Sequence, residues 1–347
     1  MASARMVTQH IEVALETADT CVLCSREGTL AYRGLHDYTF GAAGAWDYRE
    51  CPRCGLLWLS PRPLPAEMGK FYATYLTHAA KNDHIIARRL NDKLKLALWA
   101  RALRSPALVP NWFWAQIARI SSLDPFFREI GNIGTMYLGG IKPGRVLDVG
   151  CGNGSFLAVM QSAGWDIAGL DPDPKAAALA TERLGANILA GDLYQASFPR
   201  SSFDAVTLHH VIEHIFDPIE TLAECRRILK PGGQVVVMTP NLLSAGHKWF
   251  KANWRGLEPP RHLHLFSAKA LATAAEMAGI RIKLLRTSAC MAPGIWLESH
   301  VISRRRSGAP ERQGSLMGGL AFLAWERAVK TMRPESGEEV VLVGTAG

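Results

Sequence analysis

The sequence lacks any run of about 18 apolar residues, the minimum that a transmembrane helix requires. Met1–His10 has no apolar core of the kind found in signal peptides, and no internal repeat or long low-complexity tract is present. These absences argue against a helical membrane protein and a repeat protein, and they favour a cytoplasmic location. The seven cysteines are therefore expected to be thiols or metal ligands rather than disulfides.

The charge and the size of the chain set broad limits on its function. A net charge of +8 over 347 residues permits an anionic substrate or contact with a membrane surface, although a soluble basic enzyme is the commoner explanation. The apolar content of 48% supports a sizeable core. The length allows one large domain with appendages, or two domains.

Four of the cysteines form two Cys-x-x-Cys pairs, Cys21 with Cys24 and Cys51 with Cys54. This spacing is typical of a tetrahedral zinc site with four thiolate ligands. A redox pair or four unrelated thiols are the alternatives. Four protein ligands leave no open position, so the metal is expected to be structural. The charges between residues 21 and 54 balance, and we therefore expect no nucleic-acid partner.

A glycine-rich turn, Gly150 to Gly154, follows the apolar stretch that begins at Arg145. The pattern predicts a buried parallel strand, a turn and then a helix, which in an open α/β sheet is a ligand crevice. A dinucleotide fingerprint would need a third glycine at position 155, where the chain has Ser155. Asp148 precedes the turn instead; its carboxylate suits an ammonium group and would repel a pyrophosphate.

Further strand and helix patterns follow at regular intervals. We expect strands over residues 165–170, 186–190, 203–208, 234–238, 281–285 and 339–343, and helices over 175–184, 270–278 and 314–332. Acidic residues stand after the second and third strands, at Asp171 and Asp192. A carboxylate in the first of these positions can accept hydrogen bonds from both ribose hydroxyls of a nucleotide.

Together with the turn and Leu229-Lys230-Pro231-Gly232-Gly233, this pattern resembles the class I S-adenosylmethionine-dependent methyltransferases. The resemblance implies a Rossmann-like α/β fold with a seven-stranded, mostly parallel sheet and an antiparallel last strand. It implies that residues 139–347 form the catalytic domain, after a zinc ribbon over 1–76 and a helical cap over 77–138. The implied cofactor contacts are Asp148, Gly150, Cys151, Gly152, Gly154, Asp171, Pro172, Asp192, Leu193 and His209.

The N-terminal region carries a second resemblance. The segment from Cys51 to Trp58 is followed by Ser-Pro-Arg-Pro over 60–63 and by an expected helix with Phe71 and Tyr72. This order resembles a zinc-binding module attached to many bacterial methyltransferases. Some of these act on sugars or polysaccharides. The resemblance therefore implies a structural zinc and a small-molecule, sugar or glycan acceptor.

Candidate catalytic residues follow the fourth strand. Transfer to a hydroxyl requires a general base, and His214 is the first choice, with His210 and Glu213 beside it at i, i+3 and i+4 spacing. Ubiquinone-biosynthesis O-methyltransferases, which the chain resembles here, have a Glu-x-x-Glu-His motif that can bind a divalent metal. His210 replaces the first glutamate, although two histidines and a carboxylate can still bind a metal. Roles in helix capping or in holding the cofactor loop are the structural alternative. The expected acceptor contacts after the fifth strand are Trp254, Arg261, His262 and His264.

Residues 84–104 have helical spacing with several lysines and arginines, and Trp112 to Trp114 are aromatic. They predict either a helical cap or a cationic surface for peripheral membrane contact. We therefore expect methyl transfer to a small-molecule or glycan hydroxyl. The alternatives are C-methylation of a nucleotide-linked keto sugar, O-methylation of a quinone-type phenol, and a non-catalytic binding protein.

Overall fold

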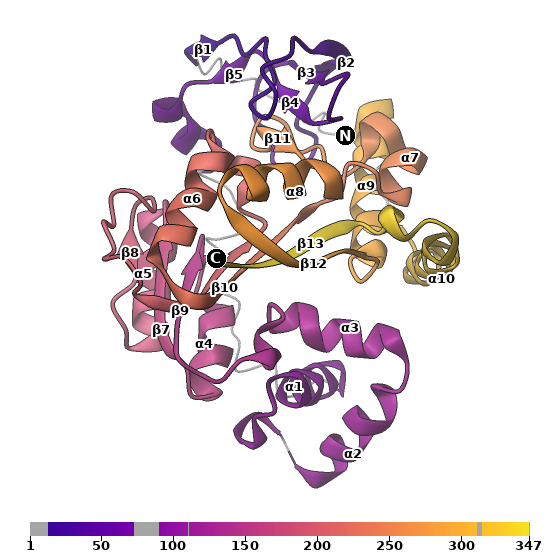
Figure 1. Cartoon of the computed structure of the whole chain (residues 1–347). Coiled ribbons are helices and arrows are strands. Elements are labelled where there is room, and N and C mark those ends of the chain that lie inside the picture. The colour runs from indigo at the N-terminus through magenta and orange to yellow at the C-terminus, as the bar shows by residue number, and fades with distance from the viewer. Residues whose placement is uncertain (1–12, 73–89, 110, 311–313, 347) are drawn as a thin grey trace.

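The computed structural model describes the chain except residues 1–12, 73–89, 110, 311–313 and 347. A small β ribbon lies at one end, a sheet with helices occupies the middle, and the helices between residues 90 and 134 lie at the opposite end (Figure 1).

The central sheet has seven strands in the order β12-β13-β10-β9-β6-β7-β8. Their bounds are β6 Arg145–Val149, β7 Asp166–Asp171, β8 Leu189–Ala190, β9 Phe203–His209, β10 Leu229–Pro240, β12 Ile280–Ser288 and β13 Glu339–Ala346. Strands β8, β7, β6, β9 and β10 pair in parallel. The last strand, β13, runs antiparallel to both β10 and β12. The predicted fold class is confirmed.

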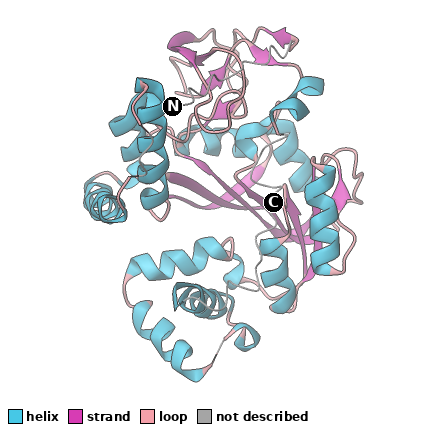
Figure 2. Ribbon diagram, turned by 180° about the vertical axis from the view of Figure 1, so that it is seen from behind, coloured by secondary structure: helices cyan, strands magenta, loops and turns pink. Residues whose placement is uncertain are grey.

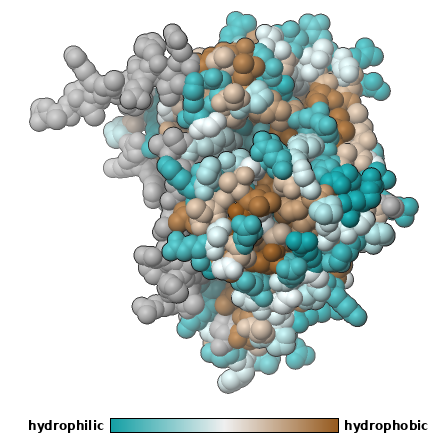
Figure 3. All heavy atoms as spheres, turned by 90° about the vertical axis from the view of Figure 1, so that its left-hand side faces the viewer, coloured by the Kyte–Doolittle hydropathy of each residue, from teal (hydrophilic) through white to brown (hydrophobic). Residues whose placement is uncertain are grey.

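Helices cover both faces of this sheet (Figure 2). They are α4 Ser155–Ser162, α5 Pro174–Leu184, α6 Pro218–Ile228 and α8 Ala268–Met277. Helix α4 packs on α5, and α6 packs on α8. The central strands are apolar on both sides, as in Val235 to Met238, which are fully buried, because each face of a parallel sheet needs a covering layer. On the left-hand side of Figure 1, hydrophobic residues gather near the centre of the surface among hydrophilic ones (Figure 3).

The ribbon contains a four-stranded sheet in the order β11-β4-β3-β2. Its strands are β2 Thr29–Leu35, β3 Trp46–Glu50, β4 Leu57–Leu59 and β11 His264–Leu265, and a separate pair joins β1 Leu15–Glu16 to β5 Arg62–Pro63. Strand β11 comes from the segment after β10, some 200 residues along the chain. The ribbon therefore shares a sheet with the segment predicted to contact the acceptor.

Helices form the remaining layers. They are α1 Leu90–Leu103, α2 Trp112–Ser121, α3 Pro125–Gly134, α7 Ala245–Phe250, α9 Ala292–Ser307 and α10 Leu316–Met332. Helix α1 packs against α2 and α3, with Leu98 buried beside Trp114; residues 84–89 of the predicted helix lie outside the described residues. Every helix in the described ranges is too short or too polar to cross a membrane.

Candidate active site

The glycine turn lies between β6 and α4, as predicted. The backbone N–H groups of Gly150 and Cys151 donate to the carbonyl of Leu170, at 2.8 and 3.0 Å, which ties the turn to β7. Gly150 has a φ of +70°, and a Cβ there would lie 2.5 Å from the Cγ2 of Val211. The turn therefore requires glycine, both for its backbone conformation and for its close approach to the loop after β9.

Two buried carboxylates flank the turn. Asp171 Oδ2 accepts the N–H of Gly152 at 2.8 Å, so it supports the turn from the end of β7. Asp148 accepts the Thr207 hydroxyl at 2.7 Å. Burial raises the pKa of Asp148 to about 7, and the nearby Asp171 adds to the effect. A bound cation would favour the ionised form, which fits a cofactor that carries an ammonium and a sulfonium.

The other predicted cofactor residues lie at the same edge of the sheet. Asp192 Oδ1 accepts the N–H groups of Tyr194 and Gln195, at 2.9 and 2.8 Å. Three more predicted residues follow the strand ends or the turn: Cys151 and Leu193 are buried, and Pro172 is exposed. Gly154, with φ +74°, begins α4, and His209 ends β9 with an exposed side chain. The structure thus places all ten predicted residues at or near the carboxyl ends of the neighbouring strands β9, β6, β7 and β8, where the glycine turn lets a ligand approach the backbone closely.

The four predicted zinc ligands converge in the ribbon. Sγ atoms are 3.5 Å apart for Cys21 and Cys54, 3.3 Å for Cys24 and Cys51, and 4.0 Å for Cys24 and Cys54. Four Zn–S bonds of about 2.3 Å in a tetrahedron place the sulfur atoms about 3.8 Å apart. Burial opposes ionisation of Cys51, but hydrogen bonds from the backbone N–H groups of Cys54 and Arg53 and from the thiols of Cys24 and Cys54 together lower its pKa to about 7. The cluster fits a tetrahedral metal ion.

His214 lies in a 3₁₀ turn, Ile212–His214, directly after β9. Its Nδ1 lies 2.9 Å from the carbonyl oxygen of Arg261. Because a carbonyl can only accept a hydrogen bond, Nδ1 carries a proton and is the donor. The hydroxyl of Tyr72 lies 3.0 Å from the same nitrogen. In the neutral ring, the bond to the Arg261 carbonyl selects the tautomer whose Nε2 carries the lone pair, which is the form that a general base or a metal ligand needs.

His210 and Glu213 form a charged pair beneath this turn. His210 donates from Nδ1 to Glu213 at 3.2 Å and from Nε2 to Glu339 at 2.8 Å. Burial opposes protonation of His210, but these two carboxylates raise its pKa to about 10. Burial opposes ionisation of Glu213, but His210 lowers its pKa to about 2. Both groups are charged at neutral pH, so His210 has no lone pair to offer as a base.

All four predicted acceptor residues are buried, with 4% or less of each exposed. Trp254 donates its indole N–H to Glu338 at 3.1 Å. His262 donates from Nδ1 to the carbonyl of Gly256 at 2.7 Å, and burial lowers its pKa to about 4. His264 donates to the carbonyl of Ile215 at 3.0 Å. The His262 ring packs edge-on against the ring of His214, with centroids 4.7 Å apart.

Glu213, His214 and His262 could together hold a metal ion, since their ligand atoms lie within 4.8 Å of one another. Glu213 also accepts the Thr239 hydroxyl, at 2.9 Å, so a metal would have to compete with two existing hydrogen bonds. A second group of this kind, His209, His210 and Glu339, includes the protonated His210.

Sequence reasoning missed two residues of this site. Tyr72 was predicted to lie on a helix, and it contacts His214 across 142 residues. Glu339 was predicted only as the start of the last strand, and it pairs with His210 across 129 residues. The position of Glu339 at the carboxyl edge of the sheet is a signal that it belongs to the site, but nothing in the local sequence identifies the partner of either residue.

Comparisons with known proteins agree with this geometry. Residues 127–285 match the family model described as a methyltransferase domain. A ubiquinone biosynthesis O-methyltransferase from Alkalilimnicola ehrlichii is 38% identical over 114 residues, which cover 30% of this chain and 44% of that protein. A "Probable S-adenosylmethionine-dependent methyltransferase" from Mycolicibacterium smegmatis is 31% identical over 139 residues, 40% of this chain and 52% of that protein. The matches thus span about half the length of these relatives.

A solved S-adenosylmethionine-dependent methyltransferase from Thermotoga maritima aligns with a TM-score of 0.42 and 20% identity, over 76% of this chain and 99% of that one. The sheet, the glycine turn and the matched family model agree on one class. Residues 127–285 therefore match a methyltransferase domain, in agreement with the predicted class of S-adenosylmethionine-dependent methyltransferases.

Proposed function

We propose that the chain transfers a methyl group from S-adenosylmethionine to the hydroxyl of a small molecule, with His214 as the general base. The observation that carries the proposal is the hydrogen bond from His214 Nδ1–H to the carbonyl of Arg261, which places the lone pair of the neutral ring on Nε2. The sulfonium of the bound cofactor supplies an activated methyl group and its own leaving group. The protein has to align the acceptor and remove its proton, and a positioned base contributes about 10²–10⁴-fold to that step.

The cofactor would lie along the crevice at the ends of β6, β7 and β8. Asp148 would face its ammonium group, Asp171 its ribose hydroxyls, and Asp192 with Leu193 its adenine. The buried carboxylate of Asp148 supports this placement, because a cation is the partner that best offsets the cost of its ionisation. His209, exposed at the end of β9, would lie beside the methyl group.

The acceptor class that we propose first is a phenolic or similar hydroxyl. The relatives named as ubiquinone biosynthesis O-methyltransferases support it, as does the Glu213-His214 pair. C-methylation of a nucleotide-linked keto sugar is the second candidate. The four-cysteine ribbon and a histidine base fit this candidate as well.

We propose one structural zinc ion on Cys21, Cys24, Cys51 and Cys54, where the sulfur spacing supports it. At the base, we propose catalysis without a metal. Each oxygen of Glu213 already accepts a hydrogen bond, from His210 and from Thr239, and a metal on His214 would consume the lone pair that the base needs.

Peripheral membrane contact is a further proposal, and it concerns α2. Trp112, Phe113 and Ile120 are 76%, 50% and 64% exposed, whereas α1 is packed between its neighbours. Sedimentation with vesicles that contain anionic lipid should pull down the chain, and a Trp112→Ala, Phe113→Ala double variant should bind less. Equal sedimentation of both proteins would count against α2.

The test of the activity uses S-adenosylmethionine with a labelled methyl group and two probes, a catechol and a nucleotide-linked keto sugar. We expect label on the catechol oxygen and much less with the His214→Ala variant. Label on the sugar carbon would select the second candidate. Transfer to either probe at the same rate by wild type and His214→Ala would reject His214 as the base.

A further inference from the structure

A buried ion-pair network joins the ribbon to the segment after β10. Arg261 is fully buried; it donates from Nη2 to Asp37 at 2.7 Å and from Nε to Glu258 at 2.9 Å. Its guanidinium lies 4.4 Å from the centre of the Phe40 ring. Removing three charged groups from water costs several kcal/mol per ion, and an apolar replacement is often as stable. The network therefore calls for a role other than stability.

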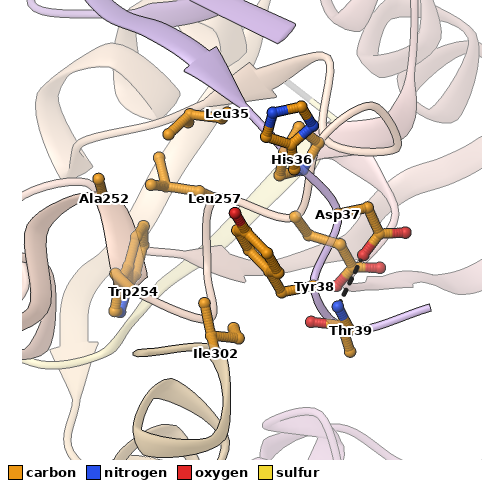
Figure 4. Close-up of a pocket in the computed structure, with 11 residues that line it drawn as sticks. Leu35, His36, Asp37, Tyr38, Thr39, Ala252, Trp254, Leu257 and Ile302 are labelled. Atoms are coloured by element: carbon orange, nitrogen blue, oxygen red, sulfur yellow. Dashed lines mark hydrogen bonds between the residues drawn. The ribbon is translucent and has the colours of Figure 1, made fainter. Parts of the chain in front are cut away.

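Asp37 is held in place by its own loop. Its Oδ1 accepts the N–H groups of Thr39 and Phe40, at 2.9 and 3.0 Å, and its Oδ2 accepts the N–H of Ala42 at 3.0 Å. Figure 4 shows Asp37 beside the cavity at this place, with its bond to Thr39. Because every one of these bonds is to backbone, the loop fixes the carboxylate that Arg261 meets.

The cavity that Asp37 lines leaves no room for an acceptor. The cavity beside Asp37 has a volume of about 20 Å³ and is walled by Trp254, Leu257 and Ile302, among others. That is space for about one water molecule. A larger pocket of about 450 Å³ adjoins Phe40 and Arg255, but neither Asp37 nor Arg261 lines it. We therefore expect Arg261 to act through the backbone that it holds.

Residues 261–264 form hydrogen bonds with His214 and with the residues on either side of it. The carbonyl of Arg261 accepts Nδ1–H of His214 at 2.9 Å. Next to it, the N–H of Leu263 donates to the carbonyl of Glu213 at 2.8 Å, and His264 donates to the carbonyl of Ile215 at 3.0 Å. Three hydrogen bonds therefore join residues 261–264 to the 3₁₀ turn, and one of them selects the tautomer of the His214 ring.

The ribbon anchors the same segment from the other side. Tyr48 directs its hydroxyl to the carbonyls of Leu257 and His262, at 2.7 and 2.8 Å, and Leu59 N–H donates to the carbonyl of Leu263 at 3.0 Å. Residues 257–264 thus lie between the ribbon and the base, with polar contacts on both sides.

We propose that Asp37 and Arg261 are positioning residues for His214: the ribbon, through this ion pair, sets the tautomer and orientation of the base. The inference rests on the proposed function. On this proposal, the ribbon contributes to the geometry of the active site and is not an independently attached module. Arg261 then positions the base instead of contacting the acceptor.

The test is ¹⁵N NMR of the full chain labelled at histidine, with the His214 signals assigned by their loss in His214→Ala. In the wild type, His214 should show the Nδ1–H tautomer at neutral pH. In Asp37→Asn, which keeps the shape but removes the charge, we expect a mixture of both tautomers. Asp47→Asn is the matched control, since Asp47 accepts the N–H of Gly34 at 2.7 Å within the ribbon; its spectrum should match the wild type.

Zinc content and S-adenosylmethionine affinity are measured on the same samples, so that only folded protein is compared. If Asp37→Asn does not fold, Arg261→Lys is used, which keeps the charge but loses the forked geometry, and the same mixture is expected. An unchanged Nδ1–H tautomer in a folded variant would overturn the proposal. The spectrum needs no acceptor, so absence of methyl transfer would count against the proposed function and leave the positioning result intact.

Discussion

The cofactor-free protein should become less stable as the pH rises, because Asp148 loses its proton in a buried position. Its carboxylate is buried, and its pKa is raised from 3.8 to about 7. A raised pKa means that the folded state holds its proton longer than the unfolded chain does. The resulting stabilisation of the folded state is complete below pH 3.8 and is lost at about 1.4 kcal/mol per pH unit until pH 7.

From pH 5 to pH 8 this loss comes to about 2.5 kcal/mol of unfolding free energy. The Asp148→Asn variant has no such titration, and its amide oxygen can still accept the Thr207 hydroxyl. Urea unfolding of both cofactor-free proteins at pH 5 and pH 8 tests this. The unfolding free energy of the variant minus that of the wild type should be about 2.5 kcal/mol greater at pH 8 than at pH 5. A difference that stays constant with pH would refute the raised pKa.

The same group should make cofactor binding depend on pH. If the ammonium of S-adenosylmethionine requires ionised Asp148, affinity at pH 6 should be about tenfold lower than at pH 8. The Asp148→Asn variant should bind weakly at both. Equal wild-type affinity at the two pH values would show that Asp148 does not face the cation.

Three further outcomes are expected. His214→Ala should keep its S-adenosylmethionine affinity and lose about 10²–10⁴-fold in turnover of the labelled catechol assay, whereas His36→Ala, at an exposed ribbon position, should change neither. Cys54→Ser should reduce the metal content measured by elemental analysis from one zinc per chain to much less, and stoichiometric zinc in the variant would contradict the four-ligand site. Asp171→Ala should weaken cofactor binding in calorimetry, because it removes the support of Gly152 N–H as well as the expected ribose contacts; unchanged affinity would remove Asp171 from the site.

The sequence predicted the parts of the fold that depend on local pattern. Apolar runs at regular spacing indicated the sheet strands, and glycines with an upstream aspartate located the turn at Gly150. It did not predict β11, because a two-residue strand that pairs with β4 has no pattern of its own. The strand β10 begins at Leu229, earlier than the expected Gln234, because residues before the Pro-Gly-Gly stretch also join the ladder.

The candidate site divides in the same way. The spacing of His210, Glu213 and His214 indicated that they lie together, and His210 does contact Glu213. Their chemical differences come from partners far along the chain: Glu339 keeps His210 protonated, and the carbonyl of Arg261 fixes His214. Only the tertiary structure supplies those partners, so the sequence could nominate three residues but could not separate their roles.

Calorimetric titration of the purified chain with S-adenosylmethionine, and separately with NADH, tests the central claim most directly. We expect one S-adenosylmethionine bound per chain at pH 8, much weaker binding to Asp148→Asn, and no binding of NADH. Tight binding of NADH with none of S-adenosylmethionine would contradict it.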